Sequence, residues 1–336
     1  MSRKARCRTI AVLLIGCCAA GASAAAETSE PVRLRLFTYF PTNDQVAHLY
    51  RELAFDLRND SGGALSLQVF TAGELPYTPF DMIKIVAAHQ VDLVDGSVGL
   101  LAGDVPELNV FGMPFLCVSF DEFNEAVGGT RTIFADHLNE KADVRVLFHW
   151  TMPPQNLWTD TPIERLEDLK GKKIRVWNQQ QVEMLKTIGA VPVSIASAEV
   201  SIALQRKVID GVITSALSVR DWKLYDFIEH GYMLNLSMGH QFVLMSQKSW
   251  SELPASLQTI LQSNARDWSA TFRRQIPAMD LDARRELRDQ GMTLREPTPF
   301  DLAKARQSAA PMWLEWAALD PVSEELLKAV RKALRK

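Results

Sequence analysis

Short apolar runs alternate along the first half of the chain with longer segments whose apolar residues recur at helical spacing. Residues 33–40 alternate apolar and polar positions, which predicts a strand, and residues 44–59 have the periodicity of an amphipathic helix. Further strands are predicted over 65–70, 91–94 and 144–150, and further helices over 79–89 and 120–141. Strands that alternate with helices are typical of an α/β fold.

A second series of the same kind follows Pro153-Pro154. It predicts strands over 172–177, 191–195, 211–215 and 241–246, and helices over 179–189, 198–208 and 221–229. A long helical stretch then runs from Ser251 to Gly291, with Pro277 placed to kink or break it. The grouping predicts lobe I over 33–152 plus about 239–275, lobe II over 153–238, and C-terminal helices over 276–336 packed across the lobes.

The amino terminus has the composition of a secretory signal peptide. Four basic residues precede an apolar run over 10–15 and an alanine-rich segment over 19–26. That segment contains the small-x-small pattern cleaved by signal peptidase, and the apolar run is shorter than the roughly 20 residues of a membrane span. We therefore expect residues 1–26 to be a signal peptide and the mature protein to be periplasmic. The sequence Leu14-Ile15-Gly16-Cys17 resembles a lipobox, so a form anchored by lipid at Cys17 remains an alternative.

Charge and cysteine content narrow the function further. Loss of residues 1–26 removes four positive charges and changes the formal net charge from −3 to −7, which gives no basic footprint for nucleic acid. It also leaves Cys117 as the one cysteine, so we expect no intramolecular disulfide. Cys117 lies in an apolar run and is expected to be a small buried residue.

The sequence motifs of common enzymes are missing. There is no G-x-S-x-G elbow, P-loop or H-E-x-x-H, and no G-x-G-x-x-G follows the first predicted strand. The six histidines are scattered, with no pair at metal-ligand spacing. We therefore expect no catalytic residues, no cofactor and no metal site, and a binding role is favoured over an enzymatic one.

Several linked motifs resemble one family. The sequences DLKGKKIRVW at 168–177 and VIDGVITS at 208–215, with AGEL at 72–75 and MPFL at 113–116, are similar to those of DctP-type solute-binding proteins of tripartite ATP-independent periplasmic (TRAP) transporters. The resemblance implies a two-lobe periplasmic-binding-protein fold with an interlobe cleft and a long bridging helix. It implies capture of a small organic acid and delivery to integral-membrane transporter subunits. A protein that feeds a membrane sensor, or an exported enzyme acting on an organic acid, remains an alternative.

Arg175 is the first candidate for ligand binding. It lies at the end of a predicted strand, where the ligand cleft of an α/β lobe normally opens. A guanidinium offers two parallel donors that match a carboxylate, which a lysine does not. The resemblance implies that Arg175 binds the ligand carboxylate; from position alone, a surface ion pair would serve equally well.

Other candidates follow from their places beside predicted strands. Trp177 and Asn178 come directly after Arg175, and Thr214 and Ser215 end the strand over 211–215. Trp177 could instead be a core residue, and the two hydroxyls could satisfy local backbone groups. Thr214 also replaces the asparagine that many family members have near this point.

Two further groups complete the predicted site. Gln155 lies nearest the position where many acid-binding family members have a second arginine, and neither it nor Trp158 adds a positive charge, so a monocarboxylate, oxo acid, sugar acid or aromatic acid is favoured over a dicarboxylate. In the first lobe, Tyr39, Glu74 and Ser97 are placed at the cleft rim, although each could be structural. Asn43 is predicted to be a helix cap rather than a ligand contact.

Overall fold

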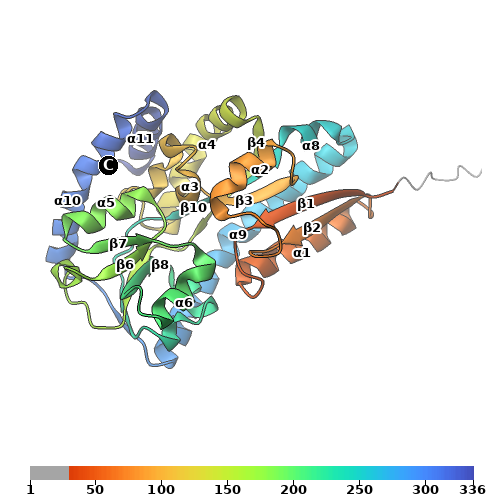
Figure 1. The fold of residues 1–336 in the computed structure, drawn as a ribbon. Helices are drawn as coiled ribbons and strands as arrows, with labels where there is room; N and C mark the ends of the chain where they lie inside the picture. The colour runs from red at the N-terminus through yellow and green to blue at the C-terminus, as the bar shows by residue number, and fades with distance from the viewer. Residues whose placement is uncertain (1–29) are drawn as a thin grey trace, which may run out of the picture. The chain divides into compact units, whose positions relative to one another are not determined.

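The structure is a computed structural model that describes residues 30–336. The predicted signal peptide, with Cys17, lies outside the described residues. Within the described chain, no helix is both long and apolar enough to cross a membrane. Figure 1 colours the chain from red at the amino-terminal end to blue at the carboxyl-terminal end.

The first sheet has five strands in the order β2-β1-β3-β10-β4. β1 pairs in parallel with β2 and β3, and β10 is antiparallel to both β3 and β4. The chain therefore comes back to the first sheet at β10, after it has formed β5 to β9 of the second sheet. The order of the predicted strands suggested this return. The bounds are β1 (Val32–Thr38), β2 (Leu65–Phe70), β3 (Leu93–Ser97), β4 (Val144–Met152) and β10 (Gly239–Ser246).

The second sheet has six strands in the order β11-β9-β5-β8-β6-β7. The bounds are β5 (Asn156–Thr159), β6 (Lys173–Val176), β7 (Val191–Ser194), β8 (Gly211–Thr214), β9 (His230–Tyr232) and β11 (Thr293–Arg295). Three strands were not predicted from the sequence, namely β5, β9 and β11, which have four, three and three residues. Such short strands show too little alternation to be recognised from their own residues.

The helices around the first sheet are α1 (Gln45–Asp60), α2 (Met82–Ala87), α3 (Val98–Leu101) and α4 (Phe120–Ala142). α1 begins at Asp44, whose Oδ1 accepts a hydrogen bond from the backbone N–H of Val46 at 2.9 Å. The prediction that Asn43 caps this helix was therefore wrong. The Asn43 amide instead donates to the backbone oxygen of Asp221 at 3.5 Å.

The helices between the strands of the second sheet are α5 (Gln179–Thr187), α6 (Val200–Gln205) and α7 (Ala216–Asp221). The helix predicted over 221–229 was wrong, because α7 ends where that helix was expected to begin. Lys223 has a left-handed backbone, with φ of 52°, which stops the helix. Leu224 and Ile228 are both buried, so their helical spacing in the sequence reflects a turn that packs into a core.

A long helix connects the cores of the two sheets. After the short α8 (Gln247–Glu252), α9 (Ala255–Asp289) continues through Pro277 without a break. Trp268 and Phe272 belong to the core of the first sheet, whereas Ala283 and Leu287 belong to a core of the second. The expected bridging helix is therefore present, and Pro277 lies between its two packed halves.

The second sheet has a core on each face. Leu157 and Ile213 belong to one apolar cluster, and their neighbours Trp158 and Val212 belong to another, as expected for residues that alternate along a strand. The C-terminal helices α10 (Pro299–Ala317) and α11 (Pro321–Leu334) follow β11. The first sheet with its helices forms the first lobe, and the second sheet with its helices forms the second lobe.

The C-terminal helices contact both lobes. Ala305 and Ala309 of α10 belong to a core of the second sheet, and Leu326 and Val330 of α11 belong to that of the first. In Figure 1 both helices are dark blue.

Candidate functional site

A small cavity lies between residues of the two lobes. Its volume is about 30 Å³, which holds about two or three water-sized spheres. The lining residues from the first lobe are Tyr39, Phe40, Ser97, Leu100, Met152, Gly239 and Gln241, and those from the second are Gln155, Arg175, Trp177, Ser197, Thr214, Ser218 and Trp222. Because the cavity is so narrow, a solute could enter only if the two walls moved apart.

Arg175 lies in the wall of this cavity, at the third residue of β6. It is 3% exposed, and its Nε and Nη1 donate to the backbone oxygens of Ile195 at 2.9 Å and Ile213 at 3.3 Å. Its partners within residues 30–336 are thus carbonyl groups, which does not fit the alternative of a surface ion pair. Burial lowers the pKa of Arg175 to about 10, an effect that Tyr39 partly offsets, so the guanidinium is charged at neutral pH.

The hydrogen bonds of Arg175 leave Nη2 of the guanidinium available. The Nε–H and one Nη1–H are used by the two carbonyls, whereas Nη2 has no hydrogen-bond partner among residues 30–336. A carboxylate that reaches Nη2 would form a charge-assisted hydrogen bond with it. No other lining residue is charged at neutral pH, since burial also raises the pKa of Tyr39 above its ordinary value.

Trp177 joins the two lobes at the edge of the cavity. Its Nε1 donates to Oε1 of Gln155 at 3.2 Å, and its ring lies against Gly99 of α3. A Cβ atom added at Gly99 would lie only 2.2 Å from Cζ3 of Trp177. The first lobe can therefore approach Trp177 because residue 99 has no side chain.

Tyr39, Thr214 and Gln155 also line the cavity, as the sequence analysis expected of cleft residues. The Tyr39 hydroxyl donates to Oε1 of Gln241 at 3.2 Å, within the first lobe. Thr214 ends β8 and is 3% exposed. Gln155 is fixed by a bond from its Nε2 to the oxygen of Pro153 at 2.8 Å.

Two serines in the lining have buried hydroxyls without a partner. Ser97 of the first lobe is 1% exposed and Ser197 of the second is 8% exposed. Neither Oγ atom has a hydrogen-bond partner among the described residues. Because a buried hydroxyl normally finds a partner, these two oxygens are well placed to bond a polar group that enters the cavity.

Four of the predicted residues do not line the cavity. Asn178 and Ser215 cap α5 and α7, where their side chains accept backbone bonds from Gln181 and Ser218. Trp158 is fully buried in a core of the second sheet, and its Nε1 donates to the Thr214 oxygen at 2.9 Å.

Glu74 is the fourth of these residues. Its Oε2 accepts bonds from the backbone N–H of Thr71 at 2.6 Å and from the Thr71 hydroxyl at 3.0 Å. These bonds lower the pKa of Glu74, which is consistent with a carboxylate that holds a turn. The sequence placed Glu74 near the cleft only because it follows Ala72-Gly73 after a strand.

Several lining residues were not predicted from the sequence. Ser197 comes three residues after β7, and Ser218 and Trp222 lie in or just after α7, so each is slightly beyond the strand end that was searched. Gln241 and Met152 lie on β10 and β4, which pair with each other in the first sheet. Their place beside the cavity depends on that pairing.

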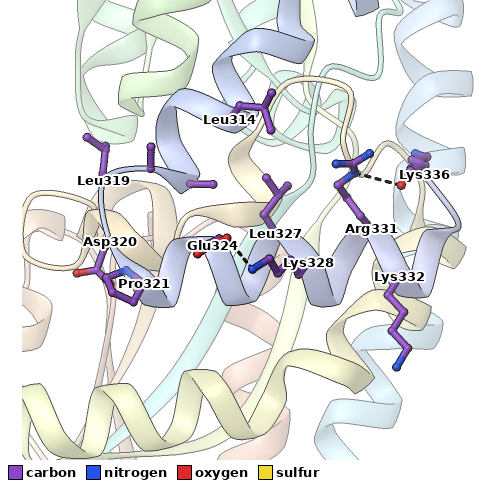
Figure 2. Close-up of a pocket in the computed structure, with 12 residues that line it drawn as sticks. Leu314, Leu319, Asp320, Pro321, Glu324, Leu327, Lys328, Arg331, Lys332 and Lys336 are labelled. Carbon is purple, nitrogen blue, oxygen red and sulfur yellow. Dashed lines mark hydrogen bonds and ion pairs between the residues drawn. The ribbon is translucent and has the colours of Figure 1, made fainter.

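A larger hollow, of about 740 Å³, lies along α10 and α11 (Figure 2). Except for Lys332, its charged side chains have partners within the described chain. Lys328 pairs with Glu324 at 2.6 Å, and Nε of Arg331 donates to the backbone oxygen of Lys336 at 3.1 Å. No serine, threonine or tyrosine lines this groove, so it lacks the unpartnered buried hydroxyls that distinguish the interlobe cavity.

Comparison with known proteins identifies the family. The family model of DctP, described as bacterial extracellular solute-binding protein, family 7, matches residues 38–319 of this chain. The chain belongs to the DctP family. The resemblance seen in the motifs is thus confirmed, and the protein is an extracytoplasmic solute-binding protein.

Relatives and solved structures agree with this membership. The sialic acid-binding periplasmic protein SiaP of Vibrio cholerae is 22% identical over 314 residues, which cover 92% of this chain and 93% of that protein. The extracytoplasmic solute receptor DctP7 of Bordetella pertussis, which binds pyroglutamic acid, is 22% identical with a TM-score of 0.85 over 89% of this chain and 99% of that one.

A TRAP solute-binding protein of Sulfitobacter with bound β-D-galacturonate gives a similar result. It is 21% identical, with a TM-score of 0.82 over 90% of this chain and 100% of that one. The predicted fold class, an α/β periplasmic-binding-protein fold with two lobes, is confirmed by these likenesses.

Proposed function

We propose that this DctP-family protein captures a small organic monocarboxylate between its lobes and delivers it to the integral-membrane subunits of a TRAP transporter. The observation that carries the proposal is Arg175, a buried guanidinium in the wall of the interlobe cavity whose Nη2 has no partner among residues 30–336. Burial of an unpaired charge costs free energy, and an anion bound beside the guanidinium would offset that cost.

One carboxylate is the number that the lining supports. Arg175 is the single charged lining residue, and the lining residue Gln155, which lies nearest the position where the family resemblance implies a second arginine, is neutral. Relatives bind pyroglutamic acid and β-D-galacturonate, which each have one carboxylate and further hydrogen-bonding groups. Ser97 and Ser197 would bond such groups on this chain's ligand.

Capture proceeds by closure of the lobes. We take the moving bodies to be residues 33–152 with about 239–275, and residues 153–238. The anion binds Arg175 on the second lobe first, and contacts with Tyr39 and Ser97 form only when the first lobe approaches. These contacts favour the closed form, which the membrane subunits would recognise.

The same proposal places the protein in the periplasm, after removal of the signal peptide or as a form anchored by lipid at Cys17. It also assigns a binding role without turnover. The lining offers no histidine or carboxylate to act as a general acid or base, since its ionisable groups are Arg175 and Tyr39. An assay for new products after incubation with a bound acid should find the acid unchanged.

A thermal-shift screen against organic acids tests the ligand class. An acid at 100 times its dissociation constant should add about 2.7 kcal/mol to the free energy of unfolding. Monocarboxylates with hydroxyl, oxo or lactam groups should give the largest shifts, and succinate a smaller one. A screen in which dicarboxylates give the largest shifts would contradict the proposed single clamp.

Calorimetry on Arg175→Ala then tests the residue. Binding of the best acid should be lost, whereas the ligand-free variant should unfold at the same or a higher temperature, because a buried uncompensated charge has been removed. Arg145→Ala is the matched control, since Arg145 is a partly buried arginine of β4 that stacks over Trp250 outside the cavity. Affinity near that of the wild type in Arg175→Ala would refute the proposal.

A further inference from the structure

A seam of reciprocal hydrogen bonds joins the start of α1 in the first lobe to the end of α7 in the second. Nε1 of Trp222 donates to Oδ2 of Asp44 at 3.0 Å. In return, the backbone N–H of Gln45 donates to Oδ2 of Asp221 at 3.2 Å. Trp222 also lines the cavity, so this seam fixes one of the side chains that would touch a ligand.

Asp44 is deeply buried in this seam, with 1% of its surface exposed. Its partners in the described part of the chain are neutral, namely the N–H groups of Val46 at 2.9 Å and Trp222 at 3.0 Å. Asp221 differs, because its Oδ1 accepts from Nε of Arg220 at 2.7 Å. The seam therefore brings two carboxylates together with one nearby arginine, and that arginine is bound to Asp221.

The charge balance explains why Asp44 binds a proton readily. Burial raises its pKa to about 7, and the charge of Asp221 adds to the effect, while the bonds from Val46 and Trp222 oppose it. Separation of the lobes would take away Asp221 and the Trp222 donor and admit water. An aspartate in water has a pKa of about 3.9.

We propose that Asp44 is a positioning residue that holds Trp222 in the wall of the ligand cavity and takes up a proton when the lobes close. The inference rests on the proposed function, because it assumes that ligand capture closes the lobes. It adds that capture of the anion is coupled to capture of a proton.

The direction of the pH effect follows from linkage. The closed form binds the proton more tightly than the open form, so closure takes up a proton between about pH 4 and pH 7. Ligand affinity should therefore increase as the pH falls, and should be about tenfold higher at pH 6 than at pH 8. The gain disappears above the pKa of the closed form, where Asp44 is ionised in both forms.

Burial also raises the pKa of Asp221, but its bonds from Arg220 and from the Gln45 N–H favour the ionised form, and Asp44→Asn separates its contribution from that of Asp44. The remaining ionisable groups near the seam do not produce this effect. Burial also raises the pKa of Asp95 to about 7, but its partners Thr38 and Trp150 lie in the first sheet and remain with it when the lobes separate. Arg220 also reaches Glu286 at 3.5 Å. Arg175 and Tyr39 titrate well above pH 8.

Calorimetric titration at pH 6 and pH 8 tests the proposal, with pyroglutamate, D-glucuronate and D-galacturonate as the three probes. All three carboxylates are ionised across this range. The wild type should bind about tenfold more tightly at pH 6, and titrations in two buffers of different ionisation enthalpy should show net proton uptake on binding at pH 6.

The variant Asp44→Asn should remove the pH effect. Asparagine is also a favoured cap, so α1 keeps its start, but the side chain no longer titrates. Its affinity ratio between pH 6 and pH 8 should be about 1. The matched control is Asp320→Asn, because Asp320 caps α11 through the same bond, to the N–H of Val322 at 2.8 Å, away from the cavity lining. This control should keep the tenfold ratio.

Trp222→Phe provides a second test. It keeps an aromatic wall but removes the donor that stabilises ionised Asp44, so the pH ratio should become larger while overall affinity falls. A ratio in Asp44→Asn equal to that of the wild type would overturn the proton linkage and leave the proposed function intact. If none of the three acids bound at either pH, the proposed ligand class and the linkage would both fail.

Discussion

The two walls of the interlobe cavity differ in charge and in completeness. The wall from the second lobe carries Arg175, whose two backbone partners, Ile195 and Ile213, belong to the same lobe. The wall from the first lobe is neutral at ordinary pH, with Tyr39 bonded to Gln241 and with no partner for the Ser97 hydroxyl among residues 30–336. The comparison suggests a division of work in which the second lobe captures the anion and the first lobe closes over it.

This division has a physical reason. A guanidinium that is held by its own lobe is oriented before the ligand arrives, so binding loses less side-chain entropy. The neutral wall then adds contacts that exist only in the closed form, which is the difference that drives a change of population. If the division is correct, changes on the two walls should affect binding to different degrees.

The largest effect is expected for Arg175→Lys on the charged wall. Lysine keeps the charge but loses the paired donors and the two carbonyl bonds, so affinity for the acid should fall by at least about 100-fold. Arg145→Lys, outside the cavity, should bind normally in the same calorimetric assay. A loss of less than about threefold in Arg175→Lys would show that a point charge is sufficient.

A smaller effect is expected for Gly99→Ala, which obstructs the approach of the neutral wall. The added Cβ would lie 2.2 Å from the ring of Trp177, so closure would require the indole to shift. Overpacking of this kind costs about 1–3 kcal/mol, which corresponds to about 5- to 150-fold in affinity. Gly103→Ala is the control, because a Cβ there meets nothing within 4 Å. Equal affinities of the two variants would indicate that Gly99 and Trp177 do not meet in the bound state.

Ser97→Ala and Ser197→Ala compare one hydroxyl from each wall. A single neutral hydrogen bond contributes about 0.5–1.5 kcal/mol, so each change should weaken binding by about 2- to 12-fold. The ligand-free variants should be at least as stable as the wild type, since neither hydroxyl has a partner in the described structure. Ser237→Ala removes a similar buried hydroxyl outside the cavity and should leave binding unchanged.

The smallest effect is expected for Glu74→Gln. Glu74 holds the backbone and hydroxyl of Thr71 and does not line the cavity, so affinity should stay within about twofold of the wild type. The variant should instead lose a little stability above pH 5. The reason is that the lowered pKa of Glu74 stabilises the folded protein where the group is ionised and ceases to do so as the pH falls. Chemical unfolding at pH 4 and pH 7 measures this difference.

Much of the fold could be predicted because long elements repeat their pattern many times. The helices now seen as α1, α4 and α9 and the strands β1, β2 and β4 were recognised from periodicity alone. The wrong or missing predictions concern short segments. β5, β9 and β11 are too short to show a period, and the turn at Lys223 imitates a helix because its buried residues have helical spacing.

The candidate site was predictable at the ends of strands. Arg175 and Thr214 lie in the last two residues of their strands and Trp177 directly follows β6, and all three line the cavity; Cys117 is fully buried as expected. Asn178 and Ser215 occupy equally good positions in the sequence but cap helices, because a residue just after a strand is often also the last before a helix. Position along the chain cannot separate these two roles.

The sequence by itself determined the α/β class, the family motifs and the arginine that offers paired donors to an anion. These are properties of local pattern and of side-chain chemistry, which a single segment carries with it. The tertiary structure alone decided which residues face Arg175 across the cavity. It also decided that Gly99 leaves room for the Trp177 ring and that Trp222 donates a hydrogen bond to Asp44. Such pairs are far apart in the chain, and only the packing of two lobes brings them within contact distance.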